Sequence, residues 1–189
     1  LGSVVIPDGV VTIYDGAFYL CQGLTDVAIP NSVTSIGKFA FSDCSSLGSI
    51  TIPDSVTSIE DGVFTSCTGL KNVVIPNSVV RIGETAFYNC DGLTSIVIPD
   101  SVTTIGEFAF SSCSGLTSVT IPDGVAAIER YTFHFCTALT KVNIPNSVVT
   151  IGDSAFGDCE SLTSIAIPKS VTFIGWGAFS ECTGLRSIS

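Results

Sequence analysis

The chain has 189 residues, of which 46% are hydrophobic and 13% are charged, so it carries enough apolar side chains to fill a core. Its formal net charge of −10, with only seven lysine and arginine residues, argues against the basic stripe that nucleic-acid binding requires. The same charge disfavours an anionic membrane surface. The apolar runs are only a few residues long, so we expect no membrane insertion.

A unit of 23 residues recurs along the whole chain without insertion or deletion. Its pattern is L-x-x-[IV]-x-I-P-x-[SG]-V-x-x-I-x-x-x-[AVT]-F-x-x-C-x-x. The units begin at Leu1, Leu24, Leu47, Leu70, Leu93, Leu116, Leu139 and Leu162, and a partial ninth unit begins at Leu185. A fixed period of this length predicts a repeat solenoid in which each unit packs on its neighbours. We therefore interpret residues 1–189 as a single array.

The fifth unit, residues 93–115, illustrates the elements expected in each coil. Alternation at residues 96–98 predicts a short strand with one buried face, and Pro99 ends it because proline cannot donate to a ladder. Polar turn residues follow, and residues 102–105 predict a second short extended segment. The inward spacing within residues 107–113 then predicts one or two turns of α- or 3₁₀-helix. The expected class is thus an α/β solenoid with short parallel strands and short helical turns.

Equivalent residues of successive units should form columns inside the solenoid. One column contains only phenylalanine, at Phe18, Phe41, Phe64, Phe87, Phe110, Phe133, Phe156 and Phe179. Another contains only cysteine, at Cys21, Cys44, Cys67, Cys90, Cys113, Cys136, Cys159 and Cys182. Stacked coils would hold the cysteine Cβ atoms about 4.8 Å apart, whereas a disulfide needs about 3.8 Å. We therefore predict a structural ladder of buried free thiols. We do not expect a zinc ribbon, because the chain has no C-x-x-C pair.

The phrase LTSIVIPDSVTTIGEFAFSSCSG, at residues 93–115, resembles the BspA-like subclass of leucine-rich repeats. The shared features are I-P after the first strand, then V-x-x-I-G, then A-F-x-x-C, and the resemblance covers the whole chain. It implies a leucine-rich-repeat fold and a surface or secreted location in a host-associated microbe. It also implies adhesin-like binding of host matrix or surface proteins. The resemblance carries over no catalytic residue, because the motif consists of core and turn positions.

Three other sequence features could carry chemistry, and each has a simpler explanation. The single histidine, His134, lacks the placed partners of a catalytic triad and is expected to be a surface variant. Stacked carboxylates such as Asp100 and Asp123 could bind calcium, but Asp is also favoured in a turn after proline. Lys169 in the same column argues against a metal spine. The charged column that includes Glu107 is expected to be a solvated stripe. We predict no catalytic residues, no metal site and no cofactor.

Aromatic residues outside the phenylalanine column are the better indication of a functional surface, because exposed aromatics mark contacts. The predicted contact surface comprises Phe39, Phe108, Tyr131, His134, Phe135, Phe173 and Trp176. The alternative is that some of these side chains pack against neighbouring coils and merely thicken the core.

Two functions remain open at the level of sequence. The first is a non-enzymatic, extracellular or cell-surface protein-binding module. The second is a structural protein that stacks into a filament or coat, since the first and last units have no polar capping sequence. In the second case the partners would be other copies of the chain, joined through uncapped ends.

Overall fold

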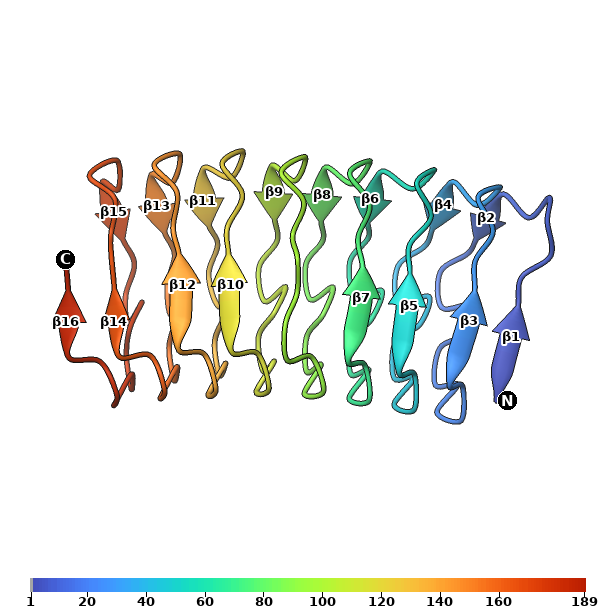
Figure 1. Ribbon diagram of the computed structural model, residues 1–189, viewed down its shortest axis with the longest axis horizontal. Coiled ribbons are helices and arrows are strands. Elements are labelled where there is room, and N and C mark those ends of the chain that lie inside the picture. Colours follow the sequence, from blue (N-terminus) through green and yellow to red (C-terminus); the bar gives the residue numbers. More distant parts are fainter. Residues whose placement is uncertain (1) are drawn as a thin grey trace.

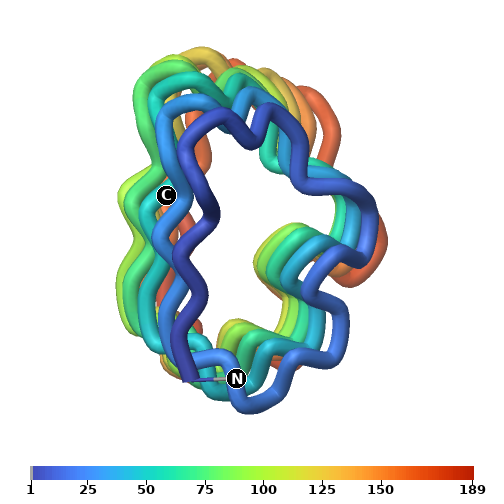
Figure 2. The backbone as a smooth tube through the Cα atoms, turned by 90° about the vertical axis from the view of Figure 1, so that its right-hand side faces the viewer, coloured from blue at the N-terminus to red at the C-terminus, as the bar shows by residue number. Residues whose placement is uncertain are grey.

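The computed structural model describes residues 2–189 and shows a solenoid in which each 23-residue unit closes one coil (Figures 1 and 2). The strands of the coils form two rows that run along the solenoid (Figure 1). The first row contains β1 (Ser3–Val5), β3 (Asp26–Ala28), β5 (Ser49–Thr51), β7 (Asn72–Val74), β10 (Ser118–Thr120), β12 (Lys141–Asn143), β14 (Ser164–Ile165) and β16 (Ser187–Ile188). The second contains β2 (Thr12–Ile13), β4 (Ser35–Ile36), β6 (Ser58–Ile59), β8 (Arg81–Ile82), β9 (Thr104–Ile105), β11 (Ala127–Ile128), β13 (Thr150–Ile151) and β15 (Phe173–Ile174). The predicted solenoid class is confirmed.

Strand pairing follows the sequence period without a slip. Every pair is parallel, and each residue faces the one 23 positions later, as Val4 faces Val27 and Ile128 faces Ile151. The burial pattern of the three-residue strands alternates, with the central residue turned inward. The fifth coil differs, because the strand predicted at residues 96–98 does not form there. That coil is joined to the fourth coil by the pairing of β8 with β9, and to the sixth coil by the hydrogen bond from the Thr117 amide to the Thr94 carbonyl.

The core consists of the predicted columns. The phenylalanine rings of successive coils stack with centroids 5.1–5.8 Å apart and interplanar angles of at most 17°. The six central rings are fully buried. Offset stacking suits the quadrupole of each ring and adds to the burial of its large apolar area. The period of the sequence thus becomes a continuous aromatic stack along the axis.

The short helices predicted for segments such as residues 107–113 are wrong, because residues 2–189 contain no helix. The reason is a left-handed backbone at two places in every coil, repeat positions 16 and 20. Position 16 is occupied by Gly16, Phe39, Gly62, Thr85, Phe108, Tyr131, Ser154 and Gly177, and position 20 by Leu20, Asp43, Ser66, Asn89, Ser112, Phe135, Asp158 and Glu181. A right-handed helix cannot continue through such residues. The segment is therefore a run of turns that folds in and out on one side of the coil (Figure 2).

Backbone hydrogen bonds of this segment alternate between its own coil and the next one. The amide of Ala109 donates to Gly106 of its own coil at 3.3 Å, and the amide of Phe110 donates to Thr132 of the next coil at 2.9 Å. The amides at repeat positions 16, 18 and 20 donate to carbonyl groups of the next coil in this way, as the Tyr131 amide does to the Asp153 carbonyl. The turns therefore join neighbouring coils by hydrogen bonds, as the strands do. These bonds satisfy the polar backbone groups that a helix would have paired internally.

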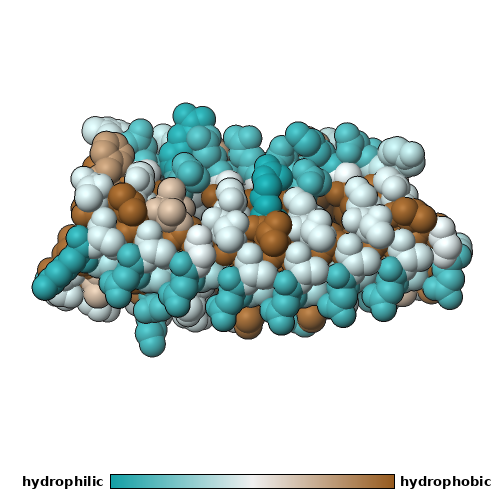
Figure 3. Space-filling model, turned by 90° about the horizontal axis from the view of Figure 1, so that it is seen from above, coloured by the Kyte–Doolittle hydropathy of each residue, from teal (hydrophilic) through white to brown (hydrophobic). Residues whose placement is uncertain are grey.

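The edge between the two strand rows is formed by the proline-containing turns. Seen from above, it presents hydrophobic residues as separate patches between hydrophilic and neutral ones (Figure 3). Serine side chains of these turns tie neighbouring coils together, as Ser101 Oγ does by donating to the Val79 carbonyl at 2.7 Å. This edge therefore offers no continuous apolar surface to a partner.

Candidate functional site

The turn face is the surface made by repeat positions 15, 16, 19 and 20, such as residues 107, 108, 111 and 112 in the fifth coil. The left-handed residues at positions 16 and 20 belong to it. Three of the predicted contact residues, Phe39, Phe108 and Tyr131, occupy position 16, and Phe135 occupies position 20. Because these aromatic side chains sit where the chain bends, they lie at the surface and not in the phenylalanine column. Phe39 and Phe135 are each 46% exposed.

Four of the predicted contact residues come together across the fifth and sixth coils. The rings of Phe108 and Tyr131 are stacked, with centroids 4.7 Å apart and an interplanar angle of 9°. The imidazole of His134 lies nearly perpendicular to the rings of Tyr131 and Phe135, with centroids 5.1 and 4.3 Å away. We call these four residues the aromatic cluster. The rings pack on one another across the two coils, and Phe135 nevertheless remains exposed.

His134 is also the link from the aromatic cluster to the seventh coil. Its Nε2 atom lies 3.2 Å from Oδ2 of Asp158. A Cβ atom at Gly157 would come within 2.9 Å of His134 Cδ2, so a glycine there makes room for the imidazole. Burial lowers the pKa of His134, and its effect outweighs the opposite effect of the Asp158 carboxylate. At neutral pH the imidazole is therefore mainly uncharged.

The other predicted contact residues lie apart from the aromatic cluster. Phe39 rests over Gly62 in the third coil, where an added Cβ atom would overlap the ring. Phe173 belongs to β15, so it lies on the strand row and not on the turn face. Trp176 is 79% exposed on the last complete coil, where its amide donates to Oδ1 of Asp153 at 2.7 Å. The structure thus joins four of the seven predicted residues and leaves three separate.

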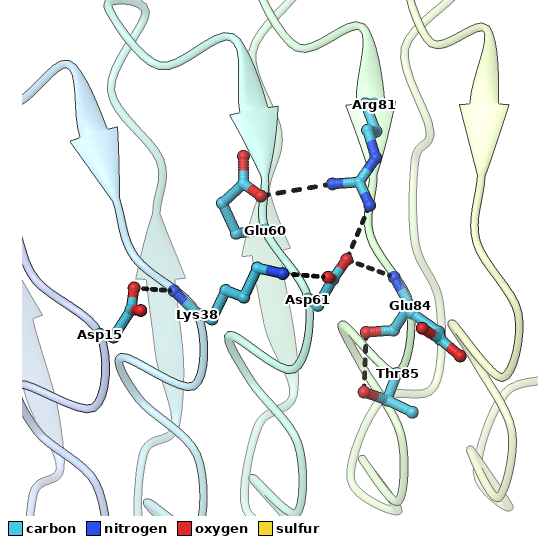
Figure 4. Close-up of polar contacts among 7 residues, drawn as sticks. All are labelled: Asp15, Lys38, Glu60, Asp61, Arg81, Glu84 and Thr85. Atoms are coloured by element: carbon cyan, nitrogen blue, oxygen red, sulfur yellow. Dashed lines mark hydrogen bonds and ion pairs between the residues drawn. The ribbon is translucent and has the colours of Figure 1, made fainter.

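The charged column at position 15 forms a network that the sequence did not reveal (Figure 4). The Asp61 carboxylate contacts Lys38 Nζ at 2.8 Å and Arg81 Nη2 at 2.7 Å, and it accepts the Glu84 amide at 3.1 Å. Arg81 also reaches Glu60 at 3.4 Å. Partial burial alone would raise the pKa of Asp61, but the hydrogen bonds from Lys38 and Arg81 lower it to about 2.

Aspartates at position 15 also cap the next coil. Oδ1 of Asp15 accepts the Lys38 amide at 2.8 Å, and Asp153 does the same for Trp176. Further along the same column, Arg130 Nε contacts Glu107 at 2.5 Å. The expected solvated stripe is therefore partly a set of bonds between coils. The presence of both acidic and basic residues in this column was the available signal, but the sequence could not say which side chains would reach one another.

The eight cysteines of the predicted ladder are free, and all except the half-buried Cys21 are buried. Each thiol from Cys44 to Cys182 donates to the phenylalanine carbonyl of the preceding coil, at 3.0–3.3 Å. Burial raises the pKa of the Cys113 thiol to about 12, so it remains a neutral donor. The described part of the chain contains no group of three His, Cys, Asp or Glu side chains that could hold a metal ion.

No helix among residues 2–189 is long and apolar enough to cross a membrane. Comparison with curated protein sequences found no significant match.

Solved structures of bacterial leucine-rich repeat proteins have the same architecture. A leucine-rich repeat protein of T. pallidum is 36% identical, with a TM-score of 0.79 over 85% of this chain and 77% of that chain. A leucine-rich repeat protein from Bacteroides ovatus is 31% identical, with a TM-score of 0.75 over 99% of this chain and 63% of that one. A leucine-rich cell surface protein from Faecalibacterium prausnitzii is 32% identical, with a TM-score of 0.62 over 100% and 66%. The chain therefore spans less than two thirds of the last two proteins.

The family assignment rests on a match along nearly the whole sequence. The family model described as BspA type leucine-rich repeat region matches residues 1–114 and 81–189, with six copies. The matched stretches contain the 23-residue units whose columns build the core. The chain therefore belongs to the BspA-type leucine-rich-repeat family.

Proposed function

We propose that this chain is a non-enzymatic protein-binding module of adhesin type, which acts at a cell surface or outside the cell. The observation that carries the proposal is the aromatic cluster on the turn face. Aromatic side chains are enriched at protein interfaces because they bury a large area and lose little conformational entropy on binding. Two similarities support the location: the family itself, and a relative described as a cell surface protein.

The shape of the turn face favours a protein partner over a small molecule. Phe108 and Tyr131 stack on each other, and His134 closes the cluster against Phe135. The cluster is thus a partly exposed patch of packed rings, which resembles the core of an interface more than the concave site that a small ligand needs. A solenoid also offers an extended surface on which a protein partner can contact several coils.

The test compares the chain with a Tyr131→Ser, Phe135→Ser double variant. Serine already occupies both repeat positions with left-handed backbone, at Ser154 and Ser112, so the double variant should fold. We expect surface plasmon resonance on immobilised fibronectin, laminin and collagen to show binding that the double variant weakens at least about tenfold. The circular dichroism spectrum should not change.

The matched control is Val97→Ser, which removes an exposed apolar side chain from the other side of the coil. Its binding should equal that of the unmodified chain. Equal binding by the double variant, or no binding of any of the three matrix proteins, would contradict the proposal.

A further inference from the structure

A hollow of about 510 Å³ opens on the turn face between the first and second coils. Tyr19 and Phe39 form its apolar walls, and Asp15 and Asp43 lie in its lining. Tyr19 is 53% exposed and Phe39 46% exposed. Among residues 2–189, neither ring stacks on another aromatic ring, in contrast to the rings of the aromatic cluster.

The carboxylates of the hollow are held in place by uncharged groups. Oδ2 of Asp43 accepts the hydroxyl of Ser42 at 2.8 Å, and Ser42 is itself buried. Oδ1 of Asp15 accepts the backbone amide of Lys38 at 2.8 Å. These bonds orient both carboxylates and leave their charges in place.

Among the residues that the structure describes, Lys38 is the one cation that lines the hollow, and it is engaged elsewhere. Lys38 Nζ extends to the Asp61 carboxylate of the third coil, 2.8 Å away, and away from Asp15 (Figure 4). The hydrogen bond and charge of Asp61 raise the pKa of Lys38, which keeps the amino group charged and in that pair. Within the described chain, the ion pairs involve neither Asp15 nor Asp43. The hollow is therefore an aromatic-walled site with two uncompensated negative charges.

We propose that this hollow receives an arginine or lysine side chain of the protein partner, an inference that rests on the proposed function. A cation is attracted to the faces of aromatic rings, and more strongly where a carboxylate is near. The net charge of −10 also favours a cationic partner. Arginine should bind better than lysine, because its planar guanidinium both stacks on rings and pairs with a carboxylate.

The hollow and the aromatic cluster share one face and lie about 15 Å apart, given three coils of about 4.8 Å each. A partner that buries an apolar patch on the cluster could therefore place a basic residue in the hollow. The cluster would supply contact area, and the hollow would supply selectivity for charge.

The experiment uses two small probes of the same shape, N-acetylarginine methylamide and the uncharged N-acetylcitrulline methylamide. They are titrated into the ¹⁵N-labelled full chain, and backbone amide shifts are followed by NMR. We expect the arginine probe to shift the amides of Tyr19, Phe39 and Asp43 with saturation, and the citrulline probe to bind at least about threefold more weakly. Added salt should weaken the arginine probe alone.

Two variants test the aromatic wall and the negative charge of the hollow. Phe39→Gly is compatible with the backbone, because Gly16, Gly62 and Gly177 hold the same left-handed position in other coils. Asp43→Asn is compatible for the same reason, since Asn89 is its equivalent. Each should weaken the arginine probe at least about threefold.

Thr85→Gly is the control, because it makes a glycine at the same repeat position in the fourth coil, outside both the hollow and the aromatic cluster, and should leave probe binding unchanged. Equal affinity for the two probes, or binding unaffected by both hollow variants, would overturn the proposal. Neither hollow variant touches Tyr131 or Phe135. Failure here is therefore distinguishable from failure of matrix-protein binding at the aromatic cluster.

Discussion

The thiol of Cys113 donates a hydrogen bond to the backbone carbonyl oxygen of Phe87, 3.1 Å away in the preceding coil. The same carbonyl accepts no strand bond, because it lies in the run of turns. The cysteine column is thus joined to the phenylalanine column by a bond that crosses from coil to coil. Three predictions concern these two columns.

We expect the buried thiols to be unreactive until the chain unfolds. A small aromatic disulfide reagent should modify the half-buried Cys21 first and reach the buried cysteines only in denaturant, because burial keeps the reagent away from them. At Cys113 burial also raises the pKa, which suppresses the reactive thiolate. Counting released chromophore in native and denaturing buffer measures this. A count that stays low in denaturant would reveal disulfides and contradict it.

Alkaline pH should destabilise the fold through the same thiols. The folded-state pKa values of Cys44 and Cys113 are raised from 9.0 to about 11 and about 12, so the unfolded chain loses these protons first. Their contribution to stability is present below pH 9 and is lost as pH rises towards the folded values. The loss for each thiol is about 1.4 kcal/mol per pH unit. Urea denaturation across this range should give a shallower decline for Cys113→Ala, and equal slopes would exclude the effect.

Truncation of a stacked ring should be costly. Phe87→Ala should lower the free energy of unfolding by about 3–5 kcal/mol, because it removes a fully buried side chain and leaves a cavity between two neighbouring rings. The matched surface variant Ser95→Ala should cost less than about 0.5 kcal/mol. Chemical denaturation compares the two, and similar values would mean that the inner and outer faces are reversed.

Glycines with the same left-handed backbone should differ in their tolerance of a Cβ atom. Gly16 and Gly62 have φ of 63° and 66°, so alanine strains both equally. A Cβ at Gly16 has ordinary contacts, whereas one at Gly62 overlaps the Phe39 ring. Gly62→Ala should therefore cost about 1 kcal/mol more than Gly16→Ala. The excess should vanish in a Phe39→Gly background, and its persistence there would point to a backbone cause.

The single histidine permits a direct pH measurement. Burial lowers the pKa of His134, so protonation disfavours the folded state, and stability falls as pH drops from 6.5 through the folded value. The ring Cε1 proton should titrate below 6.5, and lower still in Asp158→Asn, which lacks the opposing carboxylate. A titration above 6.5 would show that the Asp158 charge prevails over burial.

The periodic core was predictable because its columns repeat the same residue type. Phe87 and Cys113 have identical counterparts in every coil, so the period alone assigned them to the interior. The left-handed positions were not predictable in this way, because position 16 holds Gly62 in one coil and Thr85 in another. The inward residues of this segment do have the spacing of a helix. They are placed by a run of turns whose backbone amides donate hydrogen bonds to the next coil.

The turn-face contacts depend on side-chain geometry that a column does not encode. The stacking of Phe108 on Tyr131 of the next coil could not be predicted from the columns alone, because it depends on how each ring is oriented at the surface. The pairing of Lys38 with Asp61 likewise requires a long side chain to reach across one coil. Because Lys38 pairs with Asp61, its charged amino group does not neutralise the carboxylates of the hollow.

The hydrogen bonds that join coils also determine how the chain should respond to force. Tension applied between the two ends pulls across the ladders, so the terminal coils should peel away one after another, as a zipper opens, and not fail together. Each released 23-residue coil would lengthen the chain by about 75 Å, from about 3.3–3.6 Å per extended residue less the spacing of one coil. A tether built from such coils would yield in equal steps and absorb work at each one.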